Sequence, residues 1–381
     1  MRSFSRLVVL VASLCPIAGL AQPAGSDDVV ESFKVGTFEA DQRRFVGVVL
    51  RDRFIVDIGA ATDLYSRAAG LPELSVGSDM LEFIAGYDTN RRRIYAVVND
   101  LVEGAEANAG AWPAYVHDLA EVRTRAPIMY PSKILNAAVN FYTHVNETGT
   151  PEEIEEARRQ RRVNRGVPYL FLKPGRGAVI GNGDAIVIPW GRDRIDWEVE
   201  LGTVIGTTAK YVSADAAQDY VFGYMVTLDI SDRGGRPPGG APFQTDWFVG
   251  KGHDTFAPQG PWIVPKEFYG DPMENLRQTL SVDGEQMQEA RAGDMIHSLY
   301  ELIEYASSII TLYPGDVINN GTSGGVGMGT AVRGEQRFLR PGEEVVATID
   351  GIGTLRMPVV AGPRPSDGTG ARLPPVSSYS Q

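Results

Sequence analysis

Glu198 and Glu200 stand one residue apart in the alternating run DRIDWEVELGTVIG. Such alternation predicts a β-strand, on which residues i and i+2 face the same side. Two adjacent carboxylates repel each other, and a hard divalent cation such as Mg²⁺, Mn²⁺ or Ca²⁺ would hold both ionised. Taken alone, a Glu-x-Glu pair is more often part of a solvated strand face, so both interpretations stand at this point.

Three further residues are candidates for the same site. Asp229 lies in the β-like run GYMVTLDISDR, where a buried aspartate needs a partner. It would complete a Glu/Glu/Asp oxygen site with open positions for a substrate. Lys251 stands between two glycines and could reach a substrate anion or a carboxylate, and Thr255 could support it. Each of these residues, taken singly, is more often structural.

His144 and Glu147 form a possible acid–base pair in the stretch NFYTHVNE. If the stretch is helical, residues three apart share a face. A glutamate on one imidazole nitrogen fixes the tautomer, so that the other nitrogen can take a proton from water. The alternative is a surface ion pair. The whole sequence has only 4 histidines, which leaves few candidates for a base.

The segment after this pair predicts a helix over residues 151–165. Thr150 and Glu153 form a capping box around Pro151 at the first helical position. Glutamates come first and arginines last in EEIEEARRQRRVNR, as the helix dipole favours. The helix is either a solvated, charged element or a mobile lid over the site.

The glycine-rich stretch LYPGDVINNGTSGGVGMG permits three interpretations. Residues 321–325 satisfy the G-x-S-x-G pattern of serine hydrolases, but GVGMGTAVRGE does not predict the helix that must follow. A phosphate cradle would need a G-K-[ST] sequence, which does not follow these glycines. The favoured interpretation is a loop whose backbone amides and Thr322 approach a substrate carboxylate or oxyanion.

Composition is ordinary for a soluble globular protein, and the net charge argues against nucleic acid as the main partner. The 381 residues carry a formal net charge of -12, whereas phosphate binding requires a basic face. Residues 1–21 combine two arginines, an apolar run and small residues before a cleavage site, which predicts a signal peptide. The only cysteine, Cys15, lies inside it. We therefore expect a periplasmic or secreted protein without disulfides and without a stable membrane anchor.

After the signal peptide and a short linker, the chain divides into three predicted regions. Residues 32–125 predict a small α+β domain, with helices near 59–70 and 76–87. Residues 127–360 are rich in glycine, in strand-forming residues and in turn signals, and predict a β-rich catalytic domain. Residues 361–381 are rich in Pro, Gly and Ser, and predict a disordered tail.

Six ordered motifs resemble the fumarylacetoacetate hydrolase superfamily between about Pro131 and Leu355. They are NFYTHVNE at 140–147, FLKP at 171–174 followed by GNGDAI, DWEVELGTVIG at 196–206, GYMVTLDISDR at 223–233, GKGHDTFAPQGP at 250–261 and LYPGDVINNGTSGGVG at 312–327. The N-terminal region is also similar to the small domain that precedes the catalytic one in bacterial members.

The resemblance implies an α+β, β-rich fold with a mixed β-sandwich roll, and it implies a homodimer. It implies a Mg²⁺ or Mn²⁺ ion held by Glu198, Glu200 and Asp229. His144 and Glu147 would activate water or shuttle a proton. Lys251 would neutralise a substrate enolate or carboxylate. Thr255 would support the metal site, and Thr322 would line the pocket.

The implied substrate is a small 2-oxo or dicarbonyl acid, and the first expectation is metal-dependent hydrolysis of a C–C bond. The same site would also serve an isomerase, a hydratase or a decarboxylase. A non-catalytic periplasmic dicarboxylate-binding protein is a third possibility, although a pure binder has no use for a base.

The sequence departs from the family pattern at three places. Leu228 replaces the usual Asn before the metal aspartate, and Ser323 replaces a Pro. The usual R-D-x-Q becomes Arg233-Gly-Gly-Arg, followed by a longer loop that ends at Gln244. Arg233 and Gln244 are therefore the expected substrate contacts of this loop.

Overall fold

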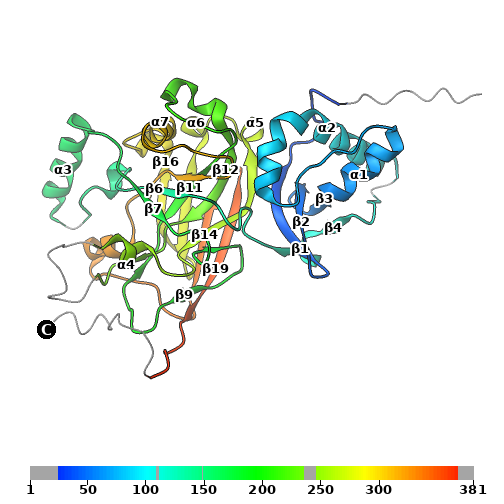
Figure 1. Cartoon of the computed structure of the whole chain (residues 1–381). Helices are drawn as coiled ribbons and strands as arrows, with labels where there is room; N and C mark the ends of the chain where they lie inside the picture. Colours follow the sequence, from blue (N-terminus) through cyan, green and yellow to red (C-terminus); the bar gives the residue numbers. More distant parts are fainter. Residues whose placement is uncertain (1–24, 109–110, 148, 236–245, 368–381) are drawn as a thin grey trace, which may run out of the picture.

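The computed structural model describes residues 25–108, 111–147, 149–235 and 246–367, and Figure 1 shows their arrangement. The predicted signal peptide and Gln244 lie outside these residues, as does most of the predicted C-terminal tail. Among the described residues, no helix combines the length and the hydropathy that a membrane crossing requires.

A large mixed sheet runs through the molecule. Its strands, in spatial order, are β4 (Val116–Asp118), β3 (Phe54–Asp57), β2 (Arg43–Leu50), β1 (Lys34–Ala40), β14 (Ala257–Pro265), β12 (Val221–Leu228), β11 (Val199–Ile205), β17 (Val317–Asn319), β6 (Ile134–Ala137) and β7 (Leu170–Lys173). β5 (Arg123–Thr124) pairs with β1, and β8 (Val179–Ile180) pairs with β14. β1 joins the N-terminal strands to β14, where Val35 lies opposite Ile263.

A second sheet packs on the C-terminal half of the first. Its order is β16 (Glu285–Arg291), β15 (Arg277–Val282), β18 (Glu344–Ile349), β19 (Gly353–Ala361) and β9 (Ile186–Ile188). The core between the sheets contains Leu201 and Tyr224 from the large sheet, with Leu280 and Leu355 from the second. A separate short ladder pairs β10 (Ile195–Asp196) with β13 (Ser231–Asp232). These layers form the predicted sandwich-like, β-rich α+β fold.

Helices lie at the ends and faces of these sheets (Figure 1). The α-helices are α1 (Ile58–Ala69), α2 (Met80–Ala107), α3 (Pro151–Val163), α4 (Trp247–Lys251), α5 (Lys266–Tyr269), α6 (Pro272–Asn275) and α7 (Leu299–Ile309). The 3-10 turns are η1 (Leu119–Glu121), η2 (Tyr142–His144), η3 (Ala214–Tyr220), η4 (Ala292–Asp294) and η5 (Gly327–Arg333).

The N-terminal helices agree with the sequence only in part. α1 matches the predicted helix at 59–70, and Gly70 ends it with φ 63. The helix predicted at 76–87 begins at Met80 and extends to Ala107. The prediction ended too early because the arginine run 91–93 interrupts the apolar pattern. Beyond this run, Ile94 and Leu101 continue the buried face.

α3 forms as the capping box predicts. The Thr150 side chain accepts a hydrogen bond from the Glu153 backbone, and the Glu153 side chain caps the Thr150 backbone in return. None of the residues of α3 is fully buried. It lies at the edge of the molecule beside β6 and β7, away from the N-terminal helices (Figure 1).

Candidate metal centre

Glu198, Glu200 and Asp229 come together at the facing ends of β11 and β12. Each offers one carboxylate oxygen, and these three oxygens lie within 4.8 Å of one another. Glu198 immediately precedes β11, and Asp229 immediately follows β12. The antiparallel pairing of these strands places Val199 opposite Leu228, so the flanking acids meet. We call these three residues the acidic cluster.

The acidic cluster is enclosed in the protein. Glu198, Glu200 and Asp229 are 4%, 1% and 1% exposed. This burial rules out the solvated strand face, which the Glu-x-Glu pattern alone favours. Buried carboxylates are retained only when positive groups or hydrogen-bond donors compensate them.

Two lysines provide part of that compensation. Lys251, the last residue of α4, donates to Glu198 Oε2 at 2.9 Å and also pairs with Asp229. Lys173, the last residue of β7, pairs with the other oxygen of Asp229 and donates to the Ile230 carbonyl at 2.9 Å. Sequence reasoning gave Lys173 no role, because its partner lies 56 residues further along the chain.

Arg233 supplies the third positive charge. Its guanidinium pairs with Glu198 through Nη2 and with Asp196 through Nε, the latter at 3.0 Å. Asp196 also accepts backbone hydrogen bonds from Gly327 and, at 3.1 Å, from Met328. Arg233 therefore contacts the acidic cluster through Glu198. Its contact with a substrate stays a prediction.

Glu200 is compensated differently from the other two acids. Its Oε2 accepts a hydrogen bond from Gly321 N at 3.1 Å and a longer one from Asn136 at 3.4 Å. No lysine or arginine among the described residues forms an ion pair with it. The Gly321 backbone has φ 84, and a Cβ there would lie 2.8 Å from the Ala137 carbonyl oxygen. Glycine is therefore required for this contact.

The charges around the acidic cluster shift its pKa values in opposite directions. Burial opposes ionisation of Glu198, but Lys251 and Arg233 outweigh it and lower its pKa to about 2. Burial raises the pKa of Glu200 well above its ordinary value, and the charges of Asp229 and Glu198 add to the rise. Glu200 is therefore the acid whose ionisation most needs another positive charge.

His144 and Glu147 form the predicted contact, although not on an α-helix. η2 ends at His144, and Asn146 has φ 50, so the chain turns before Glu147. His144 Nδ1 pairs with Glu147 Oε1. Both side chains are largely buried, which argues against a simple surface ion pair. His144 also contributes electrostatically to the lowered pKa of Glu198, so the imidazole lies near the acidic cluster.

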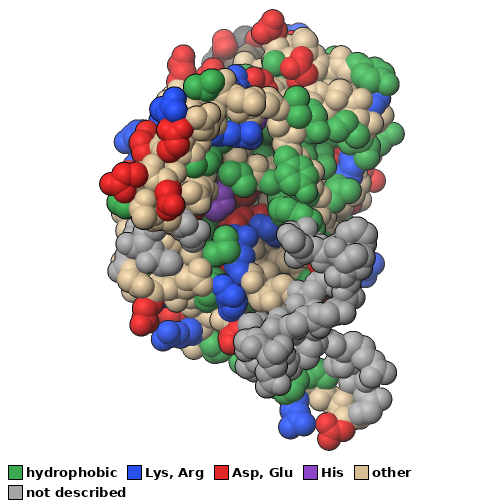
Figure 2. Space-filling view, turned by 90° about the vertical axis from the view of Figure 1, so that its left-hand side faces the viewer, with side chains coloured by type: hydrophobic (Ala, Val, Ile, Leu, Met, Phe, Trp, Pro, Cys, Tyr) green, Lys and Arg blue, Asp and Glu red, His purple; other side chains and the backbone are tan. Residues whose placement is uncertain are grey.

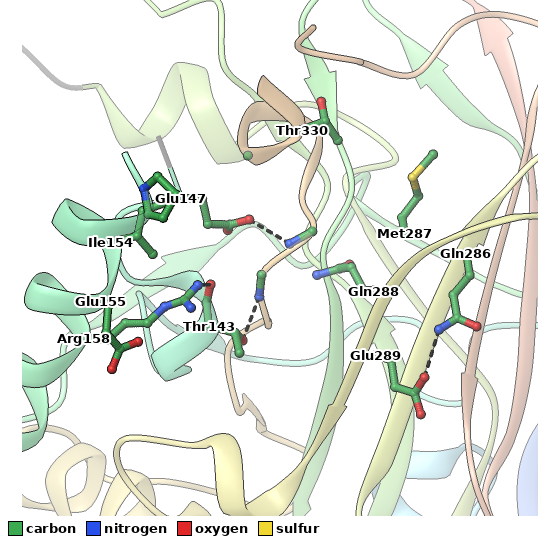
Figure 3. A pocket seen from close by; sticks show the side chains of 14 residues that line it. Thr143, Glu147, Ile154, Glu155, Arg158, Gln286, Met287, Gln288, Glu289 and Thr330 are labelled. Carbon is green, nitrogen blue, oxygen red and sulfur yellow. Dashed lines mark hydrogen bonds between the residues drawn. The ribbon is translucent and has the colours of Figure 1, made fainter. Parts of the chain in front are cut away.

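The glycine-rich loop after β17 holds the segment that carries this pair. Gly325 N donates to Glu147 Oε2 at 2.7 Å, and Gly324 N donates to Thr143 Oγ1 at 3.0 Å (Figure 3). The amides thus bind protein side chains here rather than being directed at an open anion site. The loop leads into the 3-10 turn η5, so the G-x-S-x-G pattern is not a strand-to-helix elbow.

Two of the other predicted residues, Thr322 and Thr255, form hydrogen bonds within the protein. Thr322 Oγ1 donates to the Val199 carbonyl at 2.9 Å and accepts from Gln288 at 2.8 Å, which fixes the loop to the strand. Thr255 Oγ1 accepts from Val187 N at 3.0 Å, on the side of a second cavity. These contacts fix both side chains in place. The supporting role of Thr255 and the pocket-lining role of Thr322 stay predictions.

A cavity of about 550 Å³ adjoins Glu147 between α3 and β16 (Figure 3). Ile154 and Arg158 line it from α3, and Gln288 lines it from β16. The acidic cluster does not line this cavity. On the face shown in Figure 2, a histidine side chain lies at the rim of a recess, where acidic and basic side chains meet and hydrophobic side chains border the opening.

Known proteins are similar to this chain in sequence and in fold. A family model described as fumarylacetoacetate (FAA) hydrolase C-terminal matches residues 133–360. The 2,4-didehydro-3-deoxy-L-rhamnonate hydrolase of Sphingomonas sp. (strain SKA58) is 36% identical over 71% of this chain and 89% of its own. The oxaloacetate tautomerase YisK of Bacillus subtilis (strain 168) is 33% identical over 84% of this chain and 98% of its own.

A solved structure adds a bound metal to the comparison. Maleylpyruvate hydrolase from Sphingobium sp. SYK-6, in complex with manganese (II) ion and pyruvate, superposes with a TM-score of 0.60 at 28% identity. The match covers 87% of this chain and 100% of that one.

Proposed function

Because the chain belongs to the fumarylacetoacetate (FAA) hydrolase C-terminal family, we propose that it is a divalent-metal-dependent hydrolase of 1,3-dicarbonyl 2-oxo acids. The observation that supports this most is the buried cluster of Glu198, Glu200 and Asp229, with the His144–Glu147 pair near it. Hydrolysis requires a base near the carbonyl, and that base must lie within reach of the substrate's binding groups.

The charges of the site fit a divalent cation. Four buried carboxylates meet three basic groups there: Asp196, Glu198, Glu200 and Asp229 against Lys173, Lys251 and Arg233. Glu198, Glu200 and Asp229 would hold Mg²⁺ or Mn²⁺, and the manganese bound to the Sphingobium hydrolase supports this assignment. The ion would polarise the 2-oxo acid and favour its enolate. Four ionised carboxylates and three basic groups leave one negative charge in excess. A divalent ion would reverse the sign of this net charge, which favours an anionic substrate.

The chain's own residues supply the proton transfers. Glu147 Oε1 holds His144 Nδ1, which leaves Nε2 free to accept a proton from water. The resulting hydroxide adds to the distal carbonyl carbon, and the C–C bond breaks toward the 2-oxo acid. The electron pair forms an enolate, which takes up a proton to give the shorter 2-oxo acid beside a carboxylic acid. Lys251, which donates to Glu198 in the structure, would also donate a hydrogen bond to the negative charge that develops on the substrate.

A tautomerase is the second candidate. The Bacillus tautomerase aligns over 98% of its length, so its similarity includes part of the region before the family domain. Enol–keto exchange would use the same base at His144 but would break no C–C bond. The export and the homodimeric state that the sequence suggests stay predictions.

The test is turnover of acetylpyruvate in ¹⁸O-labelled water with Mg²⁺ or Mn²⁺. We expect ¹⁸O from water in the carboxylate of the released acetate, with pyruvate as the second product. Activity should be lost in EDTA and recovered when the metal is returned. His144→Ala should lower kcat by about 100-fold or more, because a general base contributes about that much. Exchange of substrate protons without any acetate would favour the tautomerase. Activity that EDTA leaves unchanged would refute the metal role.

A further inference from the structure

We infer that Phe171 and Trp247 form an apolar wall at the metal centre that selects 2-oxo acids with an aromatic or bulky apolar distal group. The inference rests on the proposed function, and it assigns these two rings a part in substrate choice. Three independent features of the fold place them on the side of the acidic cluster.

The register of β7 places Phe171 on the inner face. Phe171 lies opposite Asn136 on β6, and directly opposed residues of an antiparallel pair project to the same side of the sheet. The Asn136 side chain donates to Glu200. Phe171 also lies two residues before Lys173, whose Nζ pairs with Asp229. Both neighbours therefore identify the face toward the acidic cluster.

The single turn of α4 places Trp247 beside it. Trp247 and Lys251 are the first and last residues of α4, and residues four apart share a helix face. The Trp247 and Phe171 rings lie 4.7 Å apart, centroid to centroid, at 37°. Tyr169 packs edge-on against Trp247 at 5.7 Å. Such pairs favour offset and edge-to-face geometry.

The wall adjoins the charged groups that would bind the acid end of a substrate. Lys251 Nζ lies 5.2 Å from the centre of the Phe171 ring and also donates to Glu198. The ring therefore stabilises the ammonium through a cation–π contact while remaining partly accessible. Trp247 is 39% exposed, which leaves a ring face for contact with a ligand.

These features predict a substrate with two unlike ends. The 2-oxo acid end binds where the charges are, and the distal group lies against the two rings. An apolar group that gains this contact should bind more tightly by about tenfold, the scale of one well-packed hydrophobic group in a pocket. A small or hydroxylated tail would gain little.

The test measures binding without turnover. Pyruvate and phenylpyruvate are titrated calorimetrically into the full-length Mn²⁺-loaded protein, because neither carries a second carbonyl to be cleaved. We expect phenylpyruvate to bind about tenfold more tightly than pyruvate. Phe171→Ala should bring the two affinities close together. Phe171→Leu, which keeps an apolar side chain, should retain part of the preference and guards against a misfolded variant.

The matched control is the next residue on the same strand. Leu172 is exposed and projects to the opposite face, so Leu172→Ala should leave the preference unchanged. The inference is wrong if the wild type binds pyruvate and phenylpyruvate with equal affinity. It is also wrong if Phe171→Ala and Leu172→Ala change the preference equally. If a second copy covers the Phe171 and Trp247 rings instead, Trp247→Asp should lower the mass in solution from dimer to monomer, while the wild type shows no preference between the ligands.

The outcome separates the wall from the reaction. If the protein prefers phenylpyruvate through Phe171 but cleaves no dicarbonyl acid, the apolar wall is supported and the hydrolase proposal is wrong. The hydrolase proposal is supported and the apolar wall is wrong in the opposite case. There, the wild type and Phe171→Ala each cleave acetylpyruvate and benzoylpyruvate with equal kcat/KM, and each binds pyruvate and phenylpyruvate equally.

Discussion

Glu200 is the residue whose chemistry depends most on a cation. Its folded-state pKa is raised by burial and by Asp229 and Glu198. Between the unfolded value, about 4.3, and the raised folded value, the native state binds more protons than the unfolded state. The metal-free protein therefore loses stability as pH rises through this window. A neutral amide at this position would not suffer that loss.

We therefore predict opposite effects of Glu200→Gln with and without metal. At pH 7 and in EDTA, the variant should melt at a higher temperature than the wild type, with the difference growing from pH 5 to pH 7. A metal at 100 times its Kd should stabilise the wild type by about 2.7 kcal/mol and the variant far less. Thermal melts across pH measure both effects.

The control for this prediction is Glu285→Gln, which changes an exposed strand glutamate. It should melt like the wild type in both conditions. If metal raises the melting temperature of Glu200→Gln as much as that of the wild type, Glu200 does not hold the ion.

Single residues also show what sequence can and cannot reveal. Glu198, Glu200 and Asp229 were predictable because acids in strand-like, apolar surroundings are chemically unusual. Lys173 was missed because only the sheet brings its strand to Asp229. The hydroxyl of Thr322 fixes the loop to β11, a contact that its residue type alone did not indicate.

At the scale of elements, α3 restrains the segment that carries the proposed base. Arg158 Nη2 donates to the Thr143 carbonyl at 3.0 Å, and Arg162 lies over the Tyr142 ring at 4.9 Å. Beyond the end of α3, Arg165 pairs with Glu301. The contacts of Arg158 and Arg162 join η2 to α3, and the glycine-rich loop binds Thr143 as well.

Arg158→Gln should therefore lower kcat by about tenfold with little change in KM, since loss of a charged hydrogen bond costs about 1.5 kcal/mol. Arg158→Lys should recover part of the loss. Arg159→Gln is the control, because Arg159 pairs only with the exposed Glu156 among the described residues. Steady-state kinetics with the metal-loaded protein separate the two constants. A rise in KM alone would instead identify α3 as a substrate-closing lid.

The elements themselves were predictable to different degrees. The start of α3 follows from its capping box, which is a local signal. The His144–Glu147 contact was inferred on the condition that the stretch is helical, but hydrogen bonds from residues far along the chain hold Thr143 and Glu147 instead. Local sequence contains no information about such partners.

At the scale of the whole molecule, the N-terminal and C-terminal regions share one core. Phe83 and Tyr87 of α2 pack edge-on against Phe222 of β12. The hydroxyl of Tyr87 donates to Glu267 at 2.7 Å. A boundary near residue 126 divides the sequence by composition, but this core crosses it, and β1 continues the large sheet through β14.

We predict from this shared core that the chain unfolds as one cooperative unit. Phe83→Ala removes a ring from the shared core, and Phe256→Ala removes one from the core between the two sheets. Each should lower the free energy of unfolding by about 3–5 kcal/mol. Both should shift a single denaturant transition that far-UV circular dichroism and tryptophan fluorescence report at the same midpoint. Two transitions, of which Phe83→Ala shifts only one, would show instead that the N-terminal region folds independently of the metal centre.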